Sequence, residues 1–85
     1  MPNTYIKVIR TEQGVRLRIA KVPLTTTAGV PNTVAHNLPK APLFAFYVPA
    51  NGDGSWYETA VPDGTNAYLT VGASGPTSFT MYAFY

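Results

Sequence analysis

Glycine and proline recur so often in this chain that they argue against helices. The 85 residues include seven glycines and eight prolines. Proline removes a backbone donor, and glycine weakens the interior of a helix. Apolar and polar residues alternate in the short runs that remain, and a period of two is typical of half-buried β-strands. The sequence therefore predicts an all-β domain with no significant helix.

About seven short strands are predicted, and they suit a small antiparallel β-sandwich or barrel. Thr11-Glu12-Gln13-Gly14 joins the first two strands as a hairpin turn, and residues 23–31 are expected to be a surface connection that crosses between sheets. Asn51-Gly52-Asp53-Gly54 is a strong signal for another hairpin. The predicted strands cover residues 4–10, 15–22, 33–35, 43–48, 55–61, 66–72 and 77–85.

The run from Leu43 to Val48 is expected to be the central strand of the fold. Its six residues are all apolar, whereas the other runs are amphipathic. A short apolar run bounded by prolines predicts a strand that is buried on both faces. In the run that begins at Val15, we expect Leu17 and Ile19 to face the core and Arg16 and Arg18 to face solvent.

The length allows a single domain, residues 1–85. A chain of this size buries roughly 60–65% of its unfolded surface, which leaves an isolated monomer marginally stable. The sequence has no cysteine for a disulfide and no Cys/His cluster for a structural zinc. Assembly with other subunits is the remaining source of stability.

The last strand supplies candidate interface residues. Alternation places Phe79, Met81, Ala83 and Tyr85 toward the core and Tyr82 and Phe84 outward. An apolar surface on a strand that ends with the sequence favours association. The candidate interface is therefore Tyr82, Phe84 and Tyr85.

Charge is unevenly distributed along the chain. All six Lys and Arg residues precede Pro42 with only Glu12 among them, and Asp53, Glu58 and Asp63 follow. We interpret this pattern as the solvated faces of amphipathic strands, with head-to-tail contact between subunits as the alternative. No block of five or six like charges is present, which argues against nucleic acid as a partner. A nucleic-acid-binding barrel that uses Arg16, Arg18 and Lys21 is the weakest alternative.

The chain offers few groups for catalysis: one histidine, no cysteine and four carboxylates. Asp53 and Asp63 stand beside glycines in predicted turns, where aspartate bonds the local backbone. The sequence shows no spacing typical of metal ligands, no order of a nucleophile and its base, and no phosphate loop. We therefore expect no enzymatic activity, no cofactor and no metal. No signal peptide and no apolar run of ~18–20 residues is found, so neither export nor a membrane is expected.

His36 is the only candidate for a catalytic residue, and a structural role is expected for it. It stands where a strand gives way to a proline-bounded corner. A histidine in such a place bonds the loop backbone, and Asn37 is expected to bond its own chain two residues on. The predicted structural corner consists of His36, Asn37, Leu38 and Pro42.

This corner carries a resemblance. Thr33-Val34-Ala35-His36-Asn37-Leu38, with Pro42 and an apolar strand after it, resembles a stretch of small virion proteins of tailed bacteriophages, in their tail-fibre, head-fibre and capsid-decoration domains. Gly54-Ser55-Trp56-Tyr57 is similar to a segment that follows there, so the resemblance covers roughly residues 32–72. Pro39 and Lys40 depart from it, since glycine and an aromatic residue are usual at those positions.

The resemblance implies a non-enzymatic structural component of a virion, made in the host cytoplasm. It implies a homo-oligomer, with a trimer favoured, and the major capsid or tail proteins of the particle as partners. The alternative is a module that binds a receptor or a host-surface glycan. Aromatic side chains stack on sugar rings, and the candidate site is Trp56 and Tyr57 with Asn51 and Asp53 of the 50–54 loop. The other interpretation of Trp56 is that it caps the core at one end of the sandwich.

Overall fold

The computed structural model describes residues 3–10, 12, 14 and 16–85. These residues form strands and loops without any helix, as the spacing of glycine and proline predicts. The seven strands are β1 (Thr4–Arg10), β2 (Arg16–Thr25), β3 (Pro31–Ala35), β4 (Phe44–Pro49), β5 (Trp56–Ala60), β6 (Asn66–Val71) and β7 (Ser78–Phe84).

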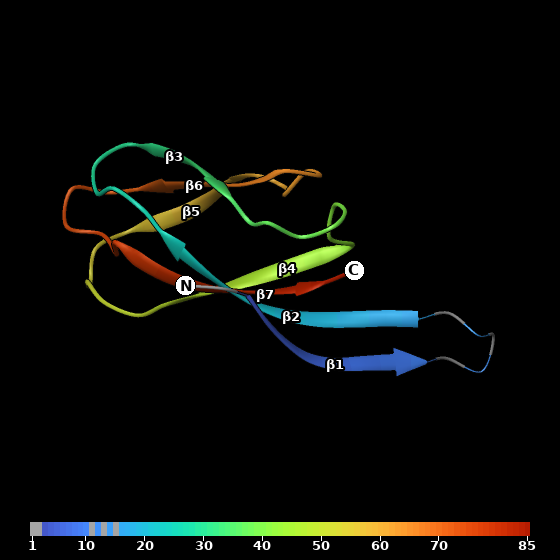
Figure 1. Cartoon of the computed structure of the whole chain (residues 1–85). Coiled ribbons are helices and arrows are strands. Elements are labelled where there is room, and N and C mark those ends of the chain that lie inside the picture. Colours follow the sequence, from blue (N-terminus) through green and yellow to red (C-terminus); the bar gives the residue numbers. More distant parts are fainter. Residues whose placement is uncertain (1–2, 11, 13, 15) are drawn as a thin grey trace.

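The strands form two antiparallel sheets that pack face to face (Figure 1). One sheet has the order β1-β2-β7-β4 and the other has the order β3-β6-β5. Alternate residues of β2, β6 and β7 point between the sheets, because successive side chains of a strand face opposite sides. The all-β sandwich prediction is therefore confirmed. The core consists of Ala20, Val22, Leu24, Leu38, Ala67, Leu69, Val71, Phe79, Met81, Ala83 and Tyr85.

The prediction that residues 43–48 form the central strand is wrong. β4 pairs only with β7 and forms one edge of the four-stranded sheet. Ala45 and Tyr47 pack against the core, but Phe44 is 54% and Phe46 49% exposed. The run is continuously apolar because one of its faces is core and the other is an exposed aromatic surface.

The expected orientation of β2 is also reversed, although Arg18 is exposed as expected. Ala20, Val22 and Leu24 are the buried residues of this strand, so Arg18 shares their face, whereas Leu17 and Ile19 lie on the outer side. The β1–β2 hairpin projects past the three-stranded sheet (Figure 1), and the molecule measures 45 × 20 × 20 Å along its principal axes. Beyond the second sheet no core covers the inner face of β2, so an arginine is tolerated there.

β2 also extends through Pro23, which was expected to begin a loop. Arg18 and Tyr85 exchange both of their backbone hydrogen bonds, so the odd-numbered residues of β2 direct their backbone groups away from β7. β1 pairs with β2 only as far as Lys21. The missing N–H of Pro23 therefore falls where the strand has no neighbour on that side.

The predicted connections are placed as follows. β1 and β2 form the predicted hairpin, and Gly14 of its turn has φ of 82°, which suits glycine; Thr11, Gln13 and Val15 lie outside the described residues. Residues 26–30 cross from the four-stranded to the three-stranded sheet. The Asn32 side chain holds this crossing, since its Oδ1 accepts from Thr27 N–H at 2.7 Å and its Nδ2 donates to the Val30 carbonyl at 2.9 Å.

Candidate functional site

Four aromatic side chains form a cluster on the outer side of the four-stranded sheet. We call Phe44, Phe46, Tyr82 and Phe84 the aromatic face. The register of β4 against β7 sets Phe44 opposite Phe84 and Phe46 opposite Tyr82. The Phe44 and Phe84 rings stack at 4.2 Å between centroids, and those of Phe46 and Tyr82 at 5.1 Å. Such cross-strand pairs hold the four rings in one layer.

The aromatic face remains largely uncovered. An aromatic side chain presents ~150–250 Å2, so Phe44 and Phe46, each about half exposed, leave on the order of 100 Å2 apiece in contact with water. Val48 on β4 and Ile19 on β2, which lies opposite Phe84, extend this surface. The total is on the order of several hundred Å2, comparable with patches that mark interaction sites on monomeric proteins.

The outer side of the three-stranded sheet has a different character. Thr59 and Thr70 are hydrogen-bonded through their hydroxyls at 2.6 Å, and the Tyr68 hydroxyl donates to the Asp63 carboxylate. These polar pairs are already satisfied within the chain. Tyr57 is an exposed aromatic residue on that side as well, but the stacked cross-strand rings belong to the four-stranded sheet.

Tyr82 and Phe84 point outward as predicted, and Phe79, Met81 and Ala83 are buried. Tyr85 does not share the aromatic face. Its side chain is 2% exposed and belongs to the core, because an odd-numbered residue of this strand points between the sheets. The core position that alternation predicts for Tyr85 is confirmed, and this burial leaves the side chain no surface for the interface role that was also assigned to it.

The His36 corner has the structural role predicted for it. The ring is completely buried, its Nδ1 accepts from Leu38 N–H at 3.0 Å, and its Nε2 lies 2.7 Å from the Asp63 carbonyl. Because Nδ1 is an acceptor here, the Nε2–H tautomer donates to Asp63. Both ring nitrogens are thus bonded to backbone of two different loops.

The self-bonding residue of the corner is His36 rather than Asn37. Asn37 has φ of 57° and is exposed, a left-handed position that asparagine tolerates. The histidine ring makes the bond to the chain two residues on. Leu38 is a member of the core and Pro42 is half-buried at the start of the approach to β4. Asn3 ties the N-terminal segment to this corner by donating to the His36 carbonyl at 2.8 Å.

Asp63 organises the turn that receives His36. Its Oδ1 accepts from Thr65 N–H at 2.8 Å and from Asn66 N–H at 2.7 Å. The hydrogen bond from Tyr68, followed by these two backbone bonds, lowers the pKa of the Asp63 carboxyl to about 2. The same bond raises the pKa of the Tyr68 phenol. The prediction that this aspartate serves its local backbone is confirmed.

Two of the four residues of the predicted glycan site are engaged within the chain. Trp56 packs against the core, with its ring edge-to-face to Phe79 at 5.0 Å, so the interpretation that it caps the core is confirmed. The Asn51 Oδ1 accepts from the backbone N–H of Thr77 at 3.1 Å and of Ser78 at 3.0 Å. Tyr57 is 61% exposed, and Asp53 is exposed in the loop.

Two loops are joined at that end of the sandwich. Gly54 N–H donates to the Ser74 carbonyl at 3.1 Å, and Gly72 N–H donates to the Ser55 carbonyl at 2.8 Å. A Cβ on Gly54 would lie 2.5 Å from the Ser74 carbonyl carbon. Gly54, one of the glycines that indicated a turn, is therefore required by the close approach of two backbones.

Arg18 and Lys21, which belong to the predicted nucleic-acid surface, do not form one patch. Arg18 and Lys21 lie on opposite faces of β2, as their odd separation requires. Within the part of the chain that the structure describes, no group of three His, Cys, Asp or Glu side chains could hold a metal ion. That part likewise holds no helix long and apolar enough to cross a membrane.

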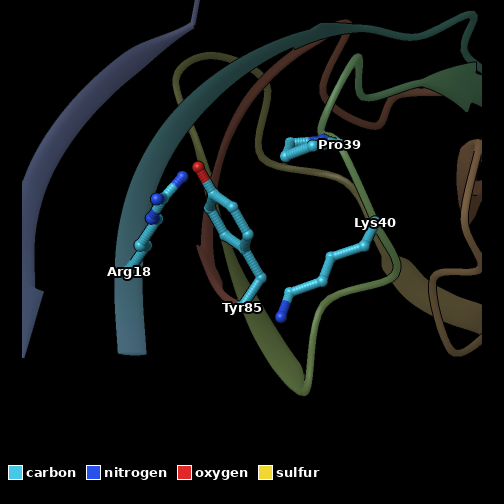
Figure 2. A pocket seen from close by; sticks show the side chains of 4 residues that line it. All are labelled: Arg18, Pro39, Lys40 and Tyr85. Carbon is cyan, nitrogen blue, oxygen red and sulfur yellow. The ribbon is translucent and has the colours of Figure 1, made fainter. Parts of the chain in front are cut away.

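A pocket of about 310 Å3 was not predicted from the sequence. Arg18, Pro39, Lys40 and Tyr85 line it (Figure 2). These residues come from β2, from the loop between the His36 corner and β4, and from the end of β7. No local motif indicates such a site, because the lining residues are separated in sequence and come together only in the folded chain.

A smaller groove of about 230 Å3 lies between the edges of the two sheets. Leu43 and Phe44 form one wall, and Glu58, Val61 and Pro62 form the other. Burial raises the pKa of the nearby Tyr47 phenol, and the Glu58 carboxylate raises it further. The groove continues the apolar surface of β4 around the edge of its sheet.

Comparisons of the chain with models of protein families, with curated proteins and with solved structures returned no match.

Proposed function

We propose that the protein is a non-enzymatic structural subunit that assembles with copies of itself through the aromatic face. The observation that carries this proposal is the exposure of Phe44 and Phe46 on an edge strand, stacked on Phe84 and Tyr82. A sheet edge and a contiguous apolar surface at the same place both favour association.

The area of the surface suits an interface of ordinary size. A stable interface buries ~800 Å2 per partner, of which about 60% is apolar. The aromatic face with Ile19, Val48 and Leu43 supplies an apolar area of that order. Every partner copy carries the same surface, so a symmetric homo-oligomer covers it without requiring a second kind of protein.

The proposal extends to a bacteriophage particle. What supports this is the similarity of residues 32–72 to a stretch of small virion proteins, together with the buried, backbone-bonded state of His36, which suits a structural rather than a catalytic corner. In this proposal the protein is a capsid-decoration, head-fibre or tail-associated subunit, with a trimer as the favoured assembly. The major capsid or tail proteins are its partners in the virion.

Analytical ultracentrifugation across a dilution series tests the assembly. The wild type is expected to sediment as an oligomer at micromolar concentration, and its mass gives the number of subunits. Phe44→Ser with Phe46→Ser removes ~200 Å2 of exposed aromatic surface per subunit, worth ~5 kcal/mol at ~25 cal/mol per Å2. We therefore expect association to weaken at least 100-fold.

The matched control is Tyr5→Ser with Tyr57→Ser. Both side chains are more exposed than Phe44, and neither belongs to the aromatic face. A monomeric wild type, or a control that dissociates as readily as the test variant, would refute the assembly surface. The virion proposal is tested separately by the protein's abundance in purified phage particles, and absence from them refutes it without affecting the assembly result.

A further inference from the structure

The pocket between Arg18, Pro39, Lys40 and Tyr85 is separate from the aromatic face. Tyr85 points between the sheets, whereas Tyr82 and Phe84 of the neighbouring strand positions point outward. The pocket volume of about 310 Å3 is at the lower end of the range for small-molecule sites. A function for this pocket therefore goes beyond the assembly of the subunit.

The lining residues favour an anion. Of the four described residues that line the pocket, two are cationic and none is acidic. Figure 2 shows the Arg18 guanidinium beside the phenolic oxygen of Tyr85, and the Lys40 side chain along the opposite wall. A guanidinium presents a planar fork of donors that matches a carboxylate or a phosphate, and an ammonium adds a point charge.

The Tyr85 hydroxyl lies near Tyr5 and Arg18, and burial together with Tyr5 raises the pKa of its phenol, but neither neighbour makes a hydrogen bond of good geometry with it. The side chain is 2% exposed, and among the described residues its buried hydroxyl has no hydrogen-bond partner. Buried hydroxyls in folded proteins normally have one, so the exception calls for an explanation. An oxygen of a ligand held by Arg18 would lie at the same end of the phenol ring and could accept this bond.

The remaining walls are apolar. Pro39 contributes its ring and Tyr85 contributes the face of its phenol (Figure 2). An inorganic ion would leave these walls uncovered, whereas a compact apolar group that carries the anion would cover them. Both features belong to one cavity.

We propose that this pocket binds a phosphate or carboxylate group carried on a small ring-shaped molecule. In the bound state the anion lies at the hydroxyl end of Tyr85, where Arg18 binds it and Tyr85 donates a hydrogen bond to it; the exposed Lys40 side chain turns from its place at the other end of the phenol ring (Figure 2) to reach it, and the ring of the ligand packs against Pro39. The residues Arg18, Lys40 and Tyr85 thus determine the charge that is selected, and Pro39 helps to select the shape.

Titration of the 15N-labelled protein with phenyl phosphate, followed by two-dimensional NMR, tests this site. For a ligand of this size we expect a Kd on the order of 1 mM, with the largest shifts at residues 18, 39–40 and 85. Benzoate in a second titration compares the carboxylate with the phosphate, and binding of either one supports the site. Inorganic phosphate in a third is expected to bind at least 3-fold more weakly.

Single substitutions separate the proposed contacts from general charge. Arg18→Gln and Lys40→Gln are each expected to weaken phenyl phosphate binding about 5–10-fold. The matched control is Lys21→Gln, which removes one exposed positive charge from the opposite face of β2 and should change the Kd less than 2-fold. Tyr85→Phe retains the buried ring and is expected to weaken binding about 3-fold or more without lowering the melting temperature.

Three results would overturn the proposal. One is the absence of localised shifts at 20 mM of phenyl phosphate and of benzoate in low-salt buffer. Another is a loss of affinity in Lys21→Gln equal to that in Lys40→Gln, which would indicate nonspecific attraction of anions. The third is equal affinity for inorganic phosphate and phenyl phosphate, which would remove the role of the apolar walls.

Discussion

His36→Ala is expected to destabilise the protein more than Phe46→Ala, although phenylalanine is the larger and more apolar residue. The His36 ring is completely buried and bonds both the Leu38 N–H and the Asp63 carbonyl. Alanine leaves a cavity and two backbone groups without their partner. A cavity term of ~2–3 kcal/mol and ~1 kcal/mol for each unpaired group give about 4–5 kcal/mol.

Phe46→Ala should cost about half of that. Emptying a fully buried phenylalanine site costs ~3–5 kcal/mol, but Phe46 is 49% exposed, so about 2 kcal/mol is expected for an isolated subunit. A domain of this length has a total stability of roughly 4–13 kcal/mol. His36→Ala therefore removes a large share of the stability, and Phe46→Ala leaves a folded protein.

Urea unfolding measured by the fluorescence of Trp56 provides the assay. Trp56 is the single tryptophan of the chain, and it packs on Phe79, so its emission reports loss of the core. The measurement is repeated over a range of protein concentrations, because a residue at an interface contributes more stability as the subunits associate. The cost of Phe46→Ala should rise with concentration, and the cost of His36→Ala should not.

A matched variant, His36→Asn, isolates one of the histidine bonds. Its side-chain oxygen can accept from the Leu38 N–H as Nδ1 does, so it should recover ~1–2 kcal/mol relative to alanine. The reasoning is refuted if Phe46→Ala is the more destabilising change at the lowest concentration. It also fails if asparagine is no better than alanine at position 36.

Two further predictions concern the turns. The Asp63 carboxylate has a pKa of about 2 in the folded protein and ~3.9 when unfolded, so its contribution to stability is complete above about pH 4 and is lost as the pH falls to 2. Asp63→Asn should weaken the dependence of the melting temperature on pH over that range. A pH profile unchanged by the substitution would contradict this role. Gly54→Ala should lower the melting temperature by more than ~5 °C, since its Cβ would meet the Ser74 backbone at 2.5 Å. Gly64→Ala is the control, with nothing within 4 Å of its Cβ, and equal effects of the two changes would show that the two loops separate easily.

The sequence alone was sufficient for the fold class and for much of the local structure. A period of two is readable without any knowledge of neighbours, so the inward residues Phe79 and Met81 and the outward residues Tyr82 and Phe84 were predicted correctly. The histidine corner was also predictable, because a buried histidine beside a proline-bounded loop needs backbone partners.

Only the tertiary structure decided which strands lie at the edges and where the core ends. The sequence of an apolar run such as residues 43–48 does not tell whether a second strand or an uncovered surface lies beyond it. β4 is an edge strand because it pairs with β7 alone. The face of β2 that holds Arg18 was determined by the extent of the second sheet, which the alternation within β2 does not encode. The pocket depended on tertiary contacts in the same way. Arg18 lies beside Tyr85 because β2 pairs with the end of β7, and Lys40, from the loop that precedes β4, lines the same pocket. Local periodicity fixes the two faces of each strand, but which of them is buried depends on the other strands.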